Sequence, residues 1–242
     1  MKYCIKIRAK KGGEYEKDRR WKIKSKGKTK PGTLSKKQIP IRTYSEWDDK
    51  RVGFMEMDLV GHDGGNVKGE FGWTLNLTDI LTGWTDFDTI KNRAQVWSFN
   101  ALINIEKRLP FRLKGIDSDN DSSFINEQLI RYCKERQITF TSSRSSRKND
   151  NCYVEQKNWS AIRRVAGYLR YDTEEALKVL NELYGYARLY VNYFQPVMKL
   201  KEKVKDGSKI TKRYDKAKTP YERLLECNEK LKRKEEGIKR YL

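Results

Sequence analysis

The chain has 242 residues, in which 53 Lys and Arg residues outnumber 33 Asp and Glu residues to leave a formal charge of +20. This length suits one main domain with an appendage and excludes several large domains. The charge favours a polyanionic partner, nucleic acid first, and because no run of about 18 apolar residues occurs, the sequence predicts no membrane association.

Residues 1–52 form the first segment along the chain. They are rich in Lys, Arg, Gly and polar residues, and Pro31 and Gly32 interrupt any periodicity, so we expect a basic arm or linker. The first eight residues are too short and too broken by basic side chains to act as a signal peptide. We therefore expect a cytoplasmic protein, associated with the nucleoid when it binds DNA.

Three strands are predicted next. Residues 54–60 are a short apolar run that carries acids at alternate positions between Gly53 and Gly61, a pattern typical of a strand. Residues 69–80 alternate large apolar side chains with smaller polar ones, and residues 83–90 repeat the pattern after a turn. We expect the second and third strands to form a hairpin, and all three to form a meander.

Helices and strands alternate in the middle of the chain. Apolar spacing and the stop at Pro110 indicate the first helix, and Ser residues can cap the second. The predicted elements are a helix over 94–108, a strand over 111–117, a helix capped by Ser122 or Ser123, a strand over 138–141 and a polar loop over 142–151.

Two further helices are expected before a charged segment. Residues 154–169 predict a helix with an inward stripe made of Glu155, Trp159, Ile162, Ala166 and Leu169. Residues 173–194 predict a longer helix that Thr173 caps and Pro196 stops. From residue 199 onward the sequence is strongly charged, and we expect a basic arm with a terminal helix that starts at Pro220.

This element order predicts an α/β domain with a five-stranded mixed sheet flanked by helices. The expected domain limits are a basic arm over 1–52, a catalytic core over 53–198 and a basic arm with a terminal helix over 199–242. Strand 111–117 can lie beside strand 54–60 in such a sheet. Asp58 and Asp119 would then face each other, and Glu155 could join them from the first turn of its helix.

Carboxylates are the side chains left for catalysis. The four cysteines have no paired spacing, which argues against a disulfide framework or a structural zinc site, and His62 is the single histidine, too few for His-based triads. Three convergent carboxylates could hold two Mg²⁺ ions for an in-line displacement at phosphorus. Asp117 could replace Asp119 as a ligand, since alternation places both on one face.

The acids and their surroundings resemble the catalytic region of bacterial insertion-sequence transposases of the DDE family, which belongs to the retroviral integrase superfamily. Thirty-five residues separate Asp119 from Glu155, the spacing typical of that family. The sequence after the second acid is similar to the family's Asp-Asn-Gly-Ser-Glu-Phe stretch, and residues 147–159 resemble the segment that introduces its catalytic helix. The likeness extends from about Lys30 to Leu225.

The resemblance implies an RNase H-like fold and a DNA transposase that cuts DNA ends and joins them to target DNA. Asp58, Asp119 and Glu155 would be its catalytic and metal-binding residues, with two Mg²⁺ or Mn²⁺ ions as cofactors. Its partners would be transposon ends and target DNA, and we expect a homo-oligomer when the protein is assembled on DNA. Six basic residues near the third acid are candidate contacts to DNA phosphates, namely Arg144, Arg147, Lys148, Lys157, Arg163 and Arg164.

Three departures from the family pattern support an alternative. Asp121 replaces the family's glycine and Ser123 its glutamate, so the turn beside the metals loses glycine's freedom. Ser145 and Ser146 stand where a proline and an aromatic residue are common. The 52 residues before the first strand leave little room for the helix-turn-helix region that the resemblance implies upstream. The alternative is an inactive, truncated transposase remnant that only binds DNA.

Overall fold

The computed structural model describes residues 39–41, 51–119, 124, 126–143, 151–207 and 209–227. All of them lie within one structural unit, Gly32–Leu242. The elements in chain order are β1 (Phe54–Gly61), β2 (Trp73–Asp79), β3 (Thr85–Ile90), α2 (Gln95–Arg108), β4 (Gly115–Ser118), α3 (Glu127–Arg136), β5 (Thr139–Ser142), α4 (Cys152–Lys157), the π-helical segment η2 (Asn158–Arg163), α5 (Arg164–Ala166), α6 (Glu174–Leu189), the π-helical segment η3 (Tyr190–Phe194), β6 (Leu200–Asp206), β7 (Lys209–Tyr214) and α7 (Pro220–Glu226).

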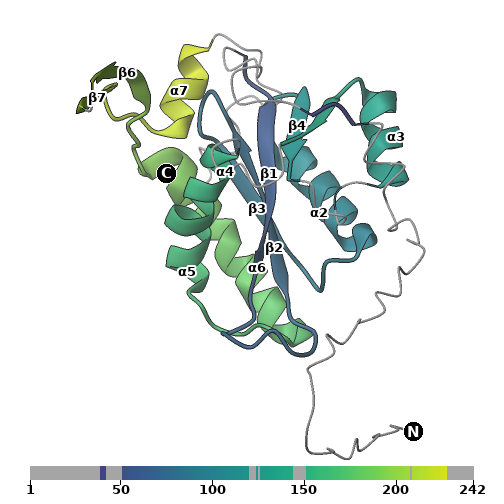
Figure 1. Cartoon of the computed structure of the whole chain (residues 1–242). Helices are drawn as coiled ribbons and strands as arrows, with labels where there is room; N and C mark the ends of the chain where they lie inside the picture. Colours follow the sequence, from purple (N-terminus) through teal and green to yellow (C-terminus); the bar gives the residue numbers. More distant parts are fainter. Residues whose placement is uncertain are drawn as a thin grey trace, which may run out of the picture. The chain divides into compact units, whose positions relative to one another are not determined.

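The main sheet has five strands in the order β3-β2-β1-β4-β5. β1 pairs antiparallel with β2, and β2 pairs antiparallel with β3. β4 pairs parallel with β1 on one side and with β5 on the other. A meander of three strands extended by two parallel strands is the RNase H-like arrangement, so the predicted fold class is confirmed. In Figure 1, α4, α5 and α6 lie to one side of β1, and α2 and α3 to the other.

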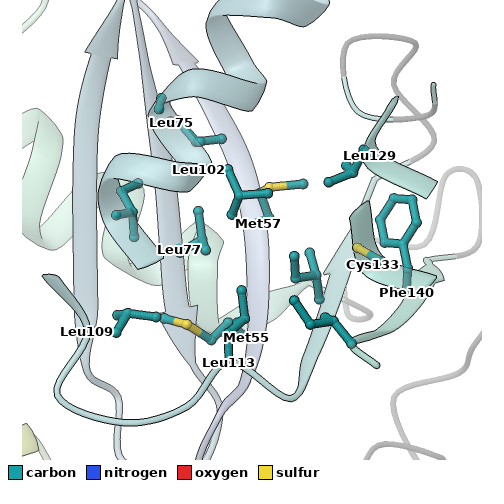
Figure 2. Close-up of a cluster of buried hydrophobic side chains, with 14 of the residues drawn as sticks. Met55, Met57, Leu75, Leu77, Leu102, Leu109, Leu113, Leu129, Cys133 and Phe140 are labelled. Atoms are coloured by element: carbon teal, nitrogen blue, oxygen red, sulfur yellow. The ribbon is translucent and has the colours of Figure 1, made fainter. Parts of the chain in front are cut away.

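One face of the sheet is apolar and carries the largest hydrophobic core. Met57 of β1 lies opposite Leu77 of β2, and Leu59 lies opposite Leu75, so alternation points these side chains to the same face. They pack with Leu102 of α2 and with residues of α3 in one buried cluster (Figure 2). Burial of this apolar surface is the main driving force for the fold.

The other face carries polar groups where β1 and β2 meet. Asp58 lies opposite Asn76, and Glu56 lies opposite Thr78, and Glu56 and Asn76 are completely buried. Further along the same face, a smaller apolar cluster that includes Val60 packs against α5 and α6. Buried polar groups cost free energy unless they are hydrogen-bonded. The polar stretch of this face is therefore the place to look for a functional site.

Two predicted strands are shorter than expected. β2 starts at Trp73 rather than at residue 69, because the preceding loop folds around Arg170, whose guanidinium donates to the backbone carbonyls of Asn66, Lys68 and Glu70. β4 starts at Gly115 rather than at residue 111. Residues 111 and 113 are buried in the core, so their alternation reflects burial rather than strand pairing.

The turn before β1 requires glycine. Gly53 has a φ of +102°, and a Cβ there would lie 2.3 Å from the carbonyl oxygen of Arg112. The Gly53 carbonyl accepts hydrogen bonds from the backbone N–H groups of Lys114 and Gly115 at the start of β4. This close approach fixes the register between β1 and β4.

The cap of α3 differs from the prediction. The helix begins at Glu127, and the cap is Asn126, whose side chain accepts a hydrogen bond from the backbone N–H of Leu129. Ser122 and Ser123, the predicted caps, lie outside the described residues. The cap of α6 is as predicted, since the Thr173 side chain accepts from the backbone N–H of Ala176.

The helix predicted over 154–169 is replaced by α4, η2 and α5. The predicted inward stripe is wrong at three positions, because Glu155 is exposed and Trp159 and Leu169 are 62% and 67% exposed. The buried face is already offset from the predicted one at Glu155 in α4, and the π-helical segment, which has more residues per turn than an α-helix, rotates the faces that follow it. The buried positions are instead Val154, Lys157, Ala161, Ile162 and Ala166.

The C-terminal segment contains more structure than the predicted arm. β6 and β7 form a two-stranded antiparallel hairpin. α7 begins at Pro220, as predicted, with a capping box between Thr219 and Glu222. Leu224 of α7 belongs to the largest hydrophobic cluster, and Tyr221 packs against it. α7 is therefore packed on the core, whereas the described side chains of β6 and β7 are largely exposed.

Candidate active site

Asp58 and Asp119 lie next to each other where the pairing between β1 and β4 ends. The parallel register pairs Met57 of β1 with Ser118 of β4. The residue after Met57 is Asp58, still within β1, and the residue after Ser118 is Asp119, just beyond β4. The sequence predicted this juxtaposition from strand order, and the register places the two acids as expected. Asp119 is close enough to Asp58 for its charge to raise the pKa of the Asp58 carboxyl.

Glu155 approaches the same place from α4. It is exposed, and its charge also raises the pKa of Asp58. Burial is the largest cause of that increase, which brings the Asp58 pKa to about 6, and hydrogen bonds from the Leu59 backbone and the Asn158 side chain oppose it. Two other acids therefore act on one half-buried carboxyl, which is the electrostatic pattern of a cluster that attracts cations.

Asn158 connects Asp58 to the sheet. Its side-chain amide donates to Oδ2 of Asp58 at 2.7 Å, and its carbonyl oxygen accepts from Nδ2 of Asn76 at 2.8 Å. The other Asp58 oxygen, Oδ1, accepts from the backbone N–H of Leu59 at 2.8 Å. Asn158 follows Glu155 by three residues, so both lie on the helix face toward Asp58. Sequence reasoning assigned no role to Asn158, although that spacing was the available signal.

Glu56 anchors the helix that carries Glu155. Its Oε2 atom accepts a hydrogen bond of 2.8 Å from the backbone N–H of Val154 in the first turn of α4. Burial raises the Glu56 pKa to about 8, and the charge of Asp117 adds to the increase. The Glu56 side chain is therefore largely uncharged at neutral pH. The sequence showed acids at alternate positions of β1, but not that one would contact a helix.

Asp117, the alternative ligand, lies deeper in the fold. It is paired with Glu56 across β1 and β4 and is 1% exposed. Thr141 of β5 donates a hydrogen bond of 2.5 Å to its Oδ1 atom. Asp119 is more accessible and acts electrically on Asp58. This geometry favours Asp119 over Asp117 as the member of the cluster.

The three carboxylates are suitable ligands for the predicted Mg²⁺ or Mn²⁺, although they do not surround a common position. Carboxylate oxygens are the ligands that Mg²⁺ and Mn²⁺ take, and a divalent cation would relieve the repulsion that raises the Asp58 pKa. Within the described ranges, however, no three His, Cys, Asp or Glu side chains are arranged to hold a metal ion. Metal binding would therefore require small movements of side chains such as exposed Glu155.

The basic residues predicted to contact DNA occupy different environments. Arg144, Arg147 and Lys148 lie outside the described residues. Arg164 is exposed, with its guanidinium 5.8 Å from the ring centroid of Trp159. Arg163 is half-buried and donates to the carbonyl oxygens of Gly61 and Gly167. DNA contact by these two arginines stays a prediction.

Lys157 is an interior lysine rather than a surface one. It is 6% exposed on the buried side of α4. Burial, followed by the charge of Lys199, lowers its pKa to about 8, so the ammonium remains the main form at pH 7. Its contact with the DNA backbone stays a prediction. The side chain that would make this contact is buried.

His62 is part of the core, which agrees with its having no predicted catalytic role. It is completely buried, and its Nε2 atom lies 2.7 Å from Oγ1 of Thr74, which in turn lies 2.9 Å from the Tyr184 hydroxyl. Burial and the charge of Arg163 lower the His62 pKa to about 4. The ring is therefore neutral at pH 7.

Comparisons with known proteins give one sequence relative. No protein-family model matches the chain. The protein named "Uncharacterized protein y4rM" of Sinorhizobium fredii (strain NBRC 101917 / NGR234) is 42% identical over 179 residues, which are 74% of this chain and 51% of that protein. The chain thus spans about half the length of this curated relative.

Similar solved structures include two retroviral integrase catalytic cores. The catalytic core domain of BIV integrase has 16% identity and a TM-score of 0.49, and the match covers 78% of this chain and 99% of that one. The HTLV-2 integrase catalytic core domain in complex with magnesium (dimeric form) has 14% identity and a TM-score of 0.45, with 60% and 88% covered. The fold assignment depends on the strand order and pairing described above. No helix among the described residues is long and apolar enough to span a membrane.

Proposed function

We propose that the chain is the catalytic region of a DNA transposase or integrase, which cuts DNA strands and transfers them to target DNA. The observation that carries this proposal is the parallel register of β1 and β4, which pairs Met57 with Ser118 and so sets Asp58 beside Asp119. Asp58 of β1 and Asp119 just beyond β4 lie where the pairing of these parallel strands ends, and Glu155 would join them from α4. The sequence resemblance to DDE-family transposases is the reason to assign DNA cleavage and strand transfer to these acids.

Asp58, Asp119 and Glu155 would hold Mg²⁺ or Mn²⁺, two ions per site. Such ions activate the attacking oxygen and stabilise the leaving oxygen of a phosphodiester. Asn158 orients Asp58 through the bond to Oδ2, and Glu56 fixes the start of the helix that carries Glu155. The formal charge of +20 attracts the DNA backbone. The proposed domain limits remain 1–52, 53–198 and 199–242, with a homo-oligomer formed on the DNA ends.

The experiment is cleavage and strand transfer of a labelled duplex that carries the element's own ends, with Mg²⁺ or Mn²⁺ present. Asp119→Asn and Glu155→Gln should each abolish both reactions and leave DNA binding nearly unchanged, because each keeps the side-chain shape and removes a ligand charge. Glu182→Gln is the matched control, because Glu182 is an exposed acid of α6. It should behave like the native chain.

An inactive remnant that only binds DNA is the competing candidate, and the sequence departures at Asp121 and Ser123 favour it. The double change Asp121→Gly with Ser123→Glu restores the family's motif and should raise activity in a weakened enzyme. If neither the native chain nor this variant cuts DNA, even with an upstream DNA-binding segment fused on, while both bind it, the chain is the remnant.

A further inference from the structure

A pocket of about 450 Å³ is lined in part by Cys152, Tyr153, Gln156 and Lys157 of α4. The β2–β3 turn, α4, the segment that enters β6, Tyr214 of β7 and the start of α7 surround it. Figure 1 shows α4, α7 and the hairpin near the same end of the sheet. Its volume lies within the range of about 300 to 1,000 Å³ that is common for small-molecule sites. None of Asp58, Asp119 and Glu155 lines it.

The lining of this pocket has one sign of charge. Lys157, Lys199, Lys218 and Arg223 contribute to it, and no Asp or Glu does so among the described residues. The rest of the wall includes apolar side chains such as Ile80 and Val197. A concave site with apolar walls and convergent cations is suited to an anionic organic molecule.

Three of the four cations already have partners within the chain. Arg223 pairs with Asp215 at 2.6 Å, and Lys218 pairs with Glu226 at 2.5 Å. Lys199 donates to the carbonyl oxygens of Ile80 and Leu81, and its ammonium lies 5.0 Å from the ring centroid of Tyr153. These contacts hold the three cations in place around the pocket.

Lys157 differs from these three cations because no described acidic side chain pairs with its ammonium. Among the residues that the structure describes, none accepts a hydrogen bond from it or forms an ion pair with it, and the charged group that acts on it is the like-charged Lys199. A lysine that is 6% exposed and lines a cavity would normally be paired, because an unpaired buried charge is costly. The missing partner is most simply an anion that enters the pocket.

We propose that this pocket binds a phosphate ester, with the Lys157 ammonium as the charge that holds the phosphate. Lys199 adds positive potential, and the apolar wall contacts the attached sugar or base. The phosphate could belong to a free nucleotide or to a DNA strand. The site itself is independent of the catalytic proposal, and only its use by DNA depends on the proposed function. It would place a phosphate against α4, the helix that carries Glu155.

The test is isothermal titration of the full chain with dAMP and with deoxyadenosine, in EDTA so that no metal site contributes. The native chain should bind dAMP, and loss of the phosphate in deoxyadenosine should remove binding. Lys157→Met should weaken dAMP binding at least about tenfold, because it removes a charge-assisted hydrogen bond to the phosphate. Lys178→Met removes an exposed lysine of α6 and should leave binding unchanged.

Further variants separate this site from folding and from catalysis. Lys157→Met should fold, with a melting temperature equal to or above that of the native chain, because it removes a buried unpaired charge. Lys157→Arg should keep much of the affinity. Glu155→Gln should bind dAMP as the native chain does, even if DNA cleavage is lost or never observed. Failure of the catalytic proposal would thus leave this result intact.

A single-stranded oligonucleotide without a terminal phosphate identifies the source of the ligand. A loss of oligonucleotide affinity in Lys157→Met, but not in Lys178→Met, assigns the pocket to a DNA backbone phosphate. Binding of dAMP alone assigns it to a free nucleotide. The proposal is overturned if neither ligand depends on Lys157, or if a glutamate-rich peptide binds in a Lys157-dependent manner and the phosphate ligands do not.

Discussion

Glu56 accepts a hydrogen bond of 2.8 Å from the backbone N–H of Val154 and so connects β1 to the first turn of α4. The N–H groups in the first turn of a helix have no intrahelical partner and need an acceptor. Glu56, a strand residue two positions before Asp58, is the acceptor here. The N–H group that it accepts from belongs to Val154, the residue directly before Glu155 in α4. Glu56 is therefore a positioning residue for the candidate active site.

Glu56→Ala should lower the free energy of unfolding by about 2 kcal/mol, because it leaves the Val154 N–H unsatisfied in a buried place. Glu56→Gln should be close to native, because it resembles the uncharged acid and keeps the acceptor. Urea unfolding measures the first effect, and the strand-transfer rate should fall with Glu56→Ala only. Glu70→Ala, at an exposed loop position, is the control. Equal stability of the Ala and Gln variants would show that the bond does not anchor α4.

Asn158→Ala should reduce the rate of DNA cleavage by roughly tenfold with little loss of DNA affinity. The amide donates to Asp58 Oδ2 and accepts from Asn76, so its removal frees the Asp58 carboxylate to rotate, and misorientation of a catalytic group is costly to rate. Asn181→Ala is a matched control, since Asn181 accepts from the Thr89 backbone far from the acids along the sequence. A rate for Asn158→Ala that equals the control rate would remove the orienting role.

The sequence was most informative where one local pattern determined one element. Acids at alternate positions of a short apolar run predicted β1, and the strand order then placed Asp58 beside Asp119. It was least informative where tertiary contacts decide. Trp159 is exposed because the buried face of this helical segment runs through Val154, Lys157 and Ala161, and Glu56 meets Val154 only because distant elements pack together. Helical periodicity carries neither piece of information.

His62 should make the protein less stable as the pH falls. Its pKa is about 4 in the folded chain against a usual 6.5, so between these values the unfolded chain binds a proton that the folded chain does not. The free energy of unfolding contributed by this group is complete above about pH 6.5 and decreases toward pH 4, by on the order of 3 kcal/mol. His62→Gln should flatten this part of the pH profile.

His62 is the single histidine of the chain, so one imidazole signal in a proton NMR spectrum reports its titration directly. Its chemical shift should stay constant from pH 8 to about pH 5 while the chain is folded. A midpoint near 6.5 in the folded protein would mean that the ring is solvated, and would contradict its burial against Thr74.

Arg163 and Arg164 are neighbours with different surroundings. Arg163 donates at 2.8 Å to the carbonyl oxygen of Gly61 in β1 and at 3.3 Å to that of Gly167. Arg164 is exposed beside Trp159. The first guanidinium therefore holds the end of α5 to the sheet, whereas the second is available to a DNA phosphate.

Arg164→Gln should weaken DNA binding regardless of sequence and leave stability unchanged. Each lost phosphate contact should reduce the slope of log affinity against log salt concentration by about 0.9, because one fewer condensed counterion is released. Arg163→Gln should instead lower the free energy of unfolding by about 1 to 3 kcal/mol, because the Gly61 carbonyl loses its charged donor. Filter-binding titrations across salt concentrations and urea unfolding of both variants measure the two effects. An unchanged salt slope for Arg164→Gln, with native affinity, would remove Arg164 from the DNA-binding surface. Other basic residues would then have to hold the DNA near the three acids.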